Sequence, residues 1–213
     1  MIRSREHALH MLAEAAELEH NLLCSYLYAA FSLKRGLDEG LEAAELEAVV
    51  RWRAAIMHVC MEEMTHLAQV ANLTVALGAR PHFNRPNLPV PPGYHPAGIQ
   101  VALAAFDRET LDHFIYLERP EGSDLEDGES YRPTVRRERH PEPGILMPSA
   151  PEYATIGEFY ALLDTGLTTP TAREHRRLAS EADASDSSAS IFMRPVAPPS
   201  SACRRPASRV AIR

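Results

Sequence analysis

The sequence predicts an all-α protein, a four-helix bundle in which a long proline-rich crossover joins the second and third helices. Alanine and leucine are abundant and aromatic residues make up only 7% of the chain, which favours helices over a β-sandwich. Two long stretches place apolar residues three or four positions apart, the spacing of one helical face. Six prolines between residues 81 and 96 exclude regular helix or sheet there.

The first two helices are the longest predicted elements. The first is expected over residues 4–34, with Ser4 as its N-cap and Gly36 as its stop. The second is expected over residues 41–77 and ends at Gly78, which a proline follows closely.

The second half of the bundle is predicted to be more irregular. Residues 80–98 form the crossover from one end of the bundle to the other, and residues 99–106 form a short strand or extended piece. The third helix is expected over residues 107–118, before Pro120. The fourth helix opens at Thr155 and is apolar only through about Leu163, so it is shorter than a symmetric bundle requires.

Composition divides the chain and excludes several functional classes. Residues 1–167 are assigned to the bundle, and residues 168–213, rich in Ser, Ala, Pro and Arg without a period, to a disordered or aberrant tail. The net charge of −7 without a basic stripe argues against nucleic-acid binding. No run approaches the roughly 20 apolar residues of a membrane span, and the N-terminus lacks an apolar leader, which predicts a cytoplasmic location. Three cysteines form neither a disulfide framework nor a zinc spacing.

The first helix carries a carboxylate in the middle of its apolar face. At about 100° per residue, several apolar side chains fall within about 60° of Glu19, namely Leu12, Ala16, Leu23, Tyr26 and Ala30. Glu14 and Glu17 fall on the opposite side and are expected to be solvated. His20 lies on the flank of the buried face.

The second helix repeats this arrangement and adds a histidine. Glu63 shares its face with a set of apolar residues, namely Trp52, Ile56, Val59, Leu67, Val70 and Leu77. His66, three residues later, is still on the buried side, whereas Glu62 points further off. A lone Glu-x-x-His pair also arises by chance, so Glu19 is what makes it informative.

The third and fourth helices each offer one more carboxylate. Glu118 stacks over Leu111, Phe114 and Ile115, with pairing to Arg119 or another arginine as the alternative role. Glu158 aligns with Leu162 and Thr165. The letters TIGE also form a capping box, with Thr155 as N-cap and Glu158 returning to the backbone, so ligand and cap are both open for Glu158.

Converging buried carboxylates need a cation. Each one alone is expensive to bury, and several together repel one another. A pair of bound metal ions removes both costs, and mixed oxygen and nitrogen ligands on helices suit iron, with manganese as an alternative. Tyr26 lies two turns beyond Glu19 and is expected near the metal, unless it only packs in the core.

At these residues the chain resembles ferritin-like di-iron proteins. The runs EHNLLCSY (19–26) and EEMTHLAQVANLTVALG (62–78) are similar to the first two helices of that group, including bacterioferritin. The runs FIYLERPE and TIGEFY, in the same order around a proline-rich crossover, resemble more closely the ferritin-like domain family of the iminophenyl-pyruvate dimer synthase type. The similarity covers about residues 5–165.

The resemblance implies a metal site and an oxidoreductase. Carried over by position, the metal ligands are Glu19, Glu63, His66, Glu118 and Glu158, and Tyr26 is the candidate catalytic residue. The chain departs from the symmetric di-iron pattern, because Ala161 stands where a second Glu-x-x-His would end. The expected activity is oxidation of a small organic substrate by a di-iron centre, in a cytoplasmic protein for which a homodimer is one possible state. The alternatives are iron binding, ferroxidase activity or peroxide protection without organic turnover, or an inactive truncated copy.

Overall fold

The computed structural model describes residues 2, 4–90, 94–95, 99–120, 122–132 and 153–168. These residues contain no strand and form four α-helices and two short 3₁₀ helices, namely α1 (Arg5–Ser32), η1 (Leu37–Glu39), α2 (Ala43–Ala76), α3 (Arg108–Leu117), η3 (Glu129–Tyr131) and α4 (Ile156–Thr168). The predicted all-α class is therefore confirmed.

Local capping explains where the helices begin. The Ser4 Oγ accepts a hydrogen bond of 3.1 Å from the His7 backbone N–H, as predicted for an N-cap. Asp107 caps α3 in the same way, through a bond of 2.7 Å from the Thr110 N–H. After α2, Gly78 has a φ of 73°, a left-handed conformation that glycine adopts without steric cost and that turns the chain out of the helix.

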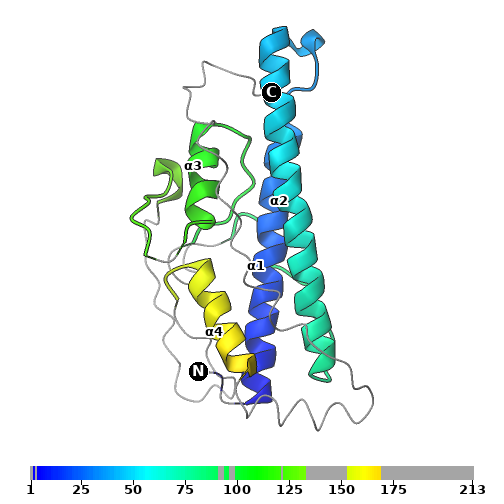
Figure 1. Ribbon diagram of the computed structural model, residues 1–213, viewed down its shortest axis with the longest axis vertical. Coiled ribbons are helices and arrows are strands. Elements are labelled where there is room, and N and C mark those ends of the chain that lie inside the picture. The colour runs from blue at the N-terminus through cyan, green and yellow to red at the C-terminus, as the bar shows by residue number, and fades with distance from the viewer. Residues whose placement is uncertain are drawn as a thin grey trace.

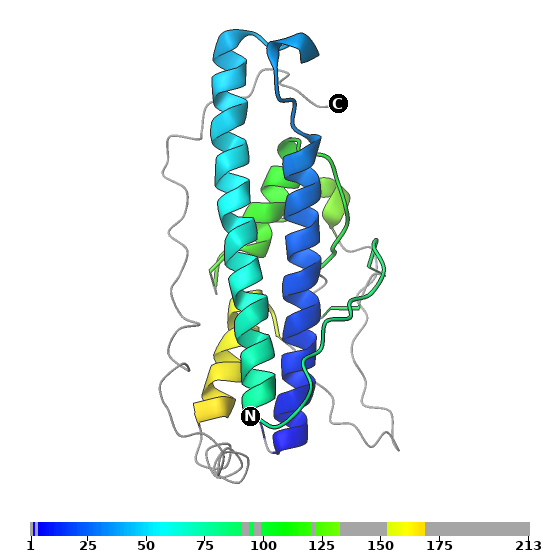
Figure 2. The same cartoon turned by 90° about the vertical axis from the view of Figure 1, so that its right-hand side faces the viewer.

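The helices are arranged around a long antiparallel hairpin. α1 and α2 lie side by side, whereas α3 lies beside one half of the hairpin and α4 beside the other half (Figures 1 and 2). The Arg119 Nη2 donates to the Ala154 carbonyl at 3.0 Å, which ties the end of α3 to the residues just before α4. The third and fourth positions of the bundle are thus occupied by two short helices that follow one another along the hairpin.

The described part of the chain between α2 and α3, which includes the crossover, connects the two ends of α1. At the start of α1 the Arg5 Nε donates to the Leu77 carbonyl at 2.6 Å, and at its end the Ser32 Oγ accepts from the Phe106 N–H at 2.8 Å. Residues 99–105 are extended, and the Val90 N–H donates to the Val101 carbonyl at 3.0 Å. The crossover therefore covers a face of α1 that would otherwise be exposed.

Two carboxylates that were predicted to be solvated are instead covered by other parts of the chain, Glu14 by Tyr153 and Glu17 in part by the crossover. Glu14 is only 8% exposed, and its Oε1 accepts a hydrogen bond of 3.1 Å from the Tyr153 hydroxyl. Glu17 accepts bonds from His82 Nε2 at 2.9 Å and from the Tyr94 hydroxyl at 2.6 Å, both in the crossover. The prediction for Glu14 and Glu17 was wrong because α1 is a central helix that is packed on more than its apolar face.

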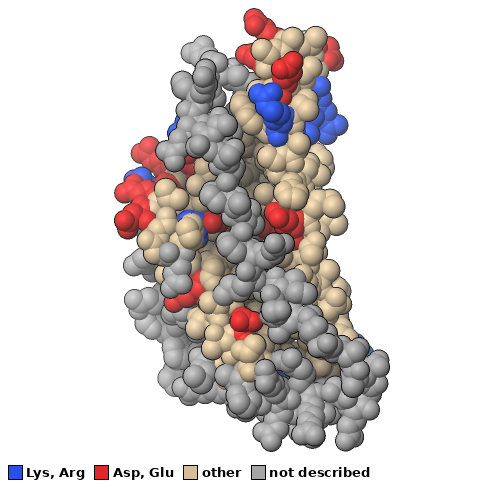
Figure 3. All heavy atoms as spheres, in the orientation of Figure 1, with Lys and Arg blue, Asp and Glu red and all other residues tan. Residues whose placement is uncertain are grey.

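The described surface gives two further observations. On the face shown in Figure 3, acidic side chains are scattered over the described residues and form no continuous pattern with the few basic ones. None of the described helices combines the length and the hydropathy that a membrane-spanning segment needs.

The predicted tail, residues 168–213, lies outside the described residues except for Thr168, which ends α4.

Candidate metal centre

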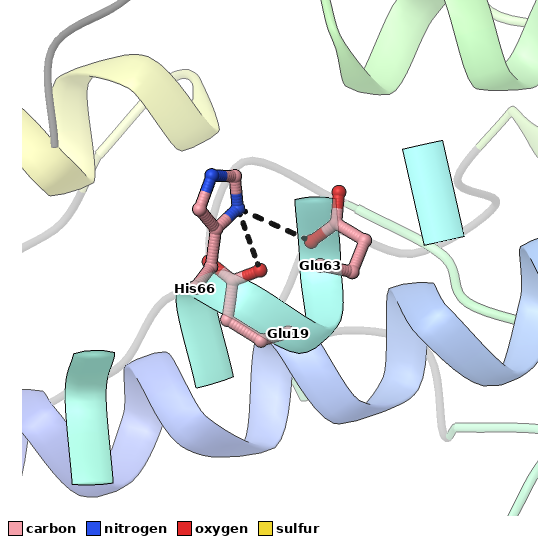
Figure 4. Close-up of side chains that lie close together, drawn as sticks. All are labelled: Glu19, Glu63 and His66. Atoms are coloured by element: carbon pink, nitrogen blue, oxygen red, sulfur yellow. Dashed lines mark ion pairs between the residues drawn. The ribbon is translucent and has the colours of Figure 1, made fainter. Parts of the chain in front are cut away.

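Three of the predicted ligands lie together in the middle of the hairpin. The His66 Nδ1 is 3.4 Å from Glu19 Oε2 and 3.6 Å from Glu63 Oε2 (Figure 4). One ligand atom from each residue lies within 4.8 Å of the others. Glu19 comes from α1, and Glu63 and His66 lie one turn apart on α2, so the packing of two helices assembles the cluster.

The cluster is buried on its inner side and open on one side. Glu19 and Glu63 are 2% and 4% exposed, whereas the His66 side chain is 36% exposed. The Glu19 Oε2 is buried, and its contact with His66 Nδ1 at 3.4 Å is an ion pair without hydrogen-bond geometry. An acceptor of this kind is costly unless a cation or a donor completes it.

Burial and mutual repulsion change the protonation of the cluster. Burial, followed by the charge of Glu19, raises the pKa of Glu63 from 4.5 to about 9. Contacts with Glu19 and then with Glu63 raise the pKa of His66 from 6.5 to about 10. Without metal, the cluster therefore holds protons at neutral pH, and the imidazolium supplies the positive charge that the carboxylates need.

Glu118 lies beside this cluster and is paired with Tyr26. The Tyr26 hydroxyl donates to Glu118 Oε1 at 2.6 Å, from α1 to the C-cap residue of α3. Glu118 as a residue is exposed, but desolvation of its carboxyl beside Tyr26, followed by the charge of Glu63, raises its pKa to about 7. Burial and then the charge of Glu118 raise the pKa of Tyr26 well above its usual value. Arg119 instead bonds to backbone carbonyls, so the alternative pairing of Glu118 with Arg119 does not form.

Sequence reasoning missed one residue at the cluster. The Tyr160 hydroxyl of α4 donates to Glu19 Oε1, the oxygen that does not face His66. Tyr160 lies in the run TIGEFY that carried the resemblance, but a tyrosine on a short apolar helix is indistinguishable from an ordinary core residue by pattern alone. Only the packing of α4 against α1 shows its contact.

The structure uses Glu158 as a cap. Its Oε2 accepts a hydrogen bond of 2.6 Å from the Ala154 N–H, and its own N–H donates to Thr155 Oγ1 at 3.0 Å. Glu158 is not a member of the cluster of Glu19, Glu63 and His66. Of the two roles left open by the sequence, the structure shows the cap: Glu158 satisfies the Ala154 N–H just before α4, and Thr155 satisfies the Glu158 N–H.

Replacing Glu158 with alanine is expected to lower the free energy of unfolding by about 0.5–2 kcal/mol, the usual cost of losing an N-terminal cap interaction. Metal affinity is expected to stay within a few-fold of the unchanged protein. Chemical denaturation and metal titration of the same preparation measure both quantities. Loss of the metal together with unchanged stability would identify Glu158 as a ligand instead.

The raised pKa values predict a stability that falls as pH rises in the metal-free protein. A group whose pKa is raised by folding stabilises the folded state fully at pH values below its unfolded-state pKa. This stabilisation is lost as the pH rises through its folded-state pKa. For Glu63 this loss runs from about pH 4.5 to about pH 9, and for His66 from about 6.5 to about 10. The Glu63→Gln variant is therefore expected to gain in melting temperature relative to the unchanged protein as pH rises from 5 to 9. A constant difference over that interval would contradict the prediction.

Comparison with known families places this site in context. A family model described as Ferritin-like matches residues 12–204. The chain belongs to the Ferritin-like family. The matched segment includes every residue of the cluster and extends beyond residue 167, the predicted end of the bundle. No curated protein and no solved structure matches the chain.

The residues of the centre fit a metal ion. The Ferritin-like family typically binds iron, and Glu19, Glu63 and His66 supply two carboxylates and one imidazole, a ligand set that suits iron and manganese. The buried Glu19 Oε2, whose contact with His66 Nδ1 is an ion pair without hydrogen-bond geometry, is an acceptor that a cation would satisfy. Ion binding would also replace the protons that hold the carboxylates together without metal.

Proposed function

We propose that this protein is a di-iron oxidoreductase that uses O₂ or peroxide to oxidise a small organic substrate. The observation that carries the proposal is the convergence of Glu19, Glu63 and His66 from two helices onto one point of a Ferritin-like chain. Random surface carboxylates do not support such a proposal, but these two are almost completely buried.

The ligands of the proposed centre come from three helices. Glu19, Glu63 and His66 would hold the first ion. Glu118, whose charge interacts with Glu63 and His66, would contribute to a second ion. Bound iron supplies one-electron redox chemistry and Lewis acidity, and manganese is the alternative metal.

The protein residues control access and protons. Glu19 and Glu63 close the inner side of the centre, and the partly exposed His66 leaves one side through which a small molecule could approach. We assign the catalytic role to Tyr26, because its buried hydroxyl is held at Glu118 beside the centre. The high pKa of Tyr26 keeps this hydroxyl protonated, so it can supply a hydrogen bond or a proton at the Glu118 oxygen.

The substrate class follows from the motifs. The ordered runs at residues 19–26, 62–78, 114–121 and 155–160 resemble the family of the iminophenyl-pyruvate dimer synthase type. This resemblance favours an imine derived from an amino acid, or a related intermediate of secondary metabolism.

Oxygen uptake by the iron-loaded protein tests the proposal. The protein is loaded with Fe(II) under anaerobic conditions, and O₂ consumption is followed with and without a panel of imines made from aromatic amino acids. Consumption well above one O₂ per centre, dependent on one substrate, is expected. Uptake that stops after the bound iron is oxidised would favour ferroxidase activity, and failure to bind iron would overturn the metal-centre proposal.

A further inference from the structure

α4 reaches the candidate centre with a tyrosine in place of a carboxylate. Glu158 and Tyr160 are two residues apart, which separates their side chains by about 200° around a helix. Glu158 bonds back to the Ala154 N–H, whereas the Tyr160 hydroxyl donates to Glu19 Oε1. The side of α4 that faces Glu19 therefore carries a phenol oxygen.

The position of Tyr160 is fixed by the core. Its neighbour Phe159 is fully buried, and the two rings lie 5.3 Å apart at 70°, an edge-to-face arrangement. Phe159 also packs against Tyr153, with ring centroids 4.8 Å apart. These contacts hold the start of α4 against α1, so the Tyr160 oxygen is placed at Glu19 by packed side chains.

The two carboxylate oxygens of Glu19 contact different residues. Its Oε2 lies 3.4 Å from His66 Nδ1, and its Oε1 accepts from Tyr160. An ion held by Glu19, Glu63 and His66 would consequently lie close to the phenol oxygen. Phenolate oxygen is a hard anionic ligand, and tyrosine is an established ligand of iron in haem proteins.

We propose that Tyr160 is a ligand of ferric iron in this centre and replaces the carboxylate expected from the fourth helix. The proposal rests on the proposed metal centre. On binding, the phenol O–H bond breaks, an Fe–O bond forms and the proton leaves to solvent. The iron stays in the ferric state, so the step requires no oxidant or reductant.

Tyr26 provides the contrast within the same site. Its hydroxyl is bound to Glu118 at 2.6 Å, on the α3 side of the cluster, and its residue is 1% exposed. Tyr28, on the same helix, is 48% exposed and serves as a surface control. The three tyrosines can therefore be separated by single substitutions to phenylalanine, which removes only the hydroxyl.

Visible absorption of the ferric protein tests the proposal. The full chain is loaded with Fe(III) from its nitrilotriacetate complex, freed of excess iron and analysed for iron content. A phenolate-to-iron charge-transfer band is expected in the unchanged protein, in Tyr26→Phe and in Tyr28→Phe. The band is expected to disappear in Tyr160→Phe while iron remains bound.

Resonance Raman spectra of the unchanged protein give a second readout that does not depend on folding of the variant. Enhancement of phenolate vibrational modes, when the charge-transfer band is excited, supports a tyrosinate ligand of the iron. Bound iron without the band, or a band that persists in Tyr160→Phe and is lost in Tyr26→Phe, would overturn the Tyr160 proposal and leave the metal centre intact. Failure of the unchanged protein to bind iron would overturn both.

Discussion

Replacing Glu63 with alanine is expected to abolish stoichiometric metal binding. Glu63 is one of the three residues whose ligand atoms lie within 4.8 Å of one another, and it contacts His66 directly. Changes to residues outside the ligand shell cost about 10–100-fold in metal affinity, so loss of a ligand is expected to cost at least about 100-fold. Metal content after gel filtration, together with a titration of Fe(II) under anaerobic conditions, measures the effect.

A matched control is available next to Glu63. The side chain of Glu62 is 33% exposed and pairs with His58 at 3.6 Å instead of joining the cluster. Glu62→Ala is expected to keep the metal with an affinity within a few-fold of the unchanged protein. Equal losses in the two variants would show that metal binding does not depend on the cluster.

Unfolding is not expected to explain the loss in the Glu63 variants. Because burial raises the pKa of Glu63 to about 9, ionising this carboxyl in the metal-free protein opposes folding. Glu63→Gln keeps the shape and removes the ionisable group, so its melting temperature at pH 8 without metal is expected to equal or exceed that of the unchanged protein. The same variant should release fewer protons when exposed to metal, which pH measurement in weak buffer records.

The long helices were predictable because local and tertiary signals agree there. The apolar stripe, the Ser4 cap and the glycine at the end of α2 each indicate the same element, and the structure places the ends of α1 and α2 within two residues of the expected positions. The central carboxylates, Glu19 and Glu63, were also predictable from the apolar stripe. An ionisable residue in the middle of such a stripe is expected to be buried, as both are.

The environments of Glu14, Glu17 and Tyr160 depend on packing between elements, which the sequence pattern of a single helix does not indicate. A helical wheel finds the apolar face of α1, but it does not show that the crossover and Tyr153 also cover the polar face, which is how Glu14 and Glu17 were misassigned. Tyr160 was missed because its pattern is that of a core residue. Its contact with Glu19 depends on how far along α1 the short helix α4 docks.

Phe159→Ala is expected to lower the free energy of unfolding by about 3–5 kcal/mol, the range for removing a fully buried phenylalanine. Phe159 is 0% exposed and belongs to the main hydrophobic core, to which α4 also contributes Leu163 and Leu167. α4 has 13 residues, and isolated helices of about that length are marginal in water, so α4 depends on this packing. Urea denaturation gives the value, and Ile115→Ala, which removes a 42% exposed side chain from α3, should cost under about 1 kcal/mol.

The same substitution links stability to the metal centre. If α4 loosens, Tyr160 is no longer held at Glu19, and the affinity for ferric iron is expected to fall even though no residue of the Glu19, Glu63 and His66 cluster has changed. Fe(II), for which a phenol is the poorer ligand, is expected to bind with a smaller loss. A cost below about 1 kcal/mol with unchanged iron affinity would mean that α4 neither anchors the core nor contributes to the centre.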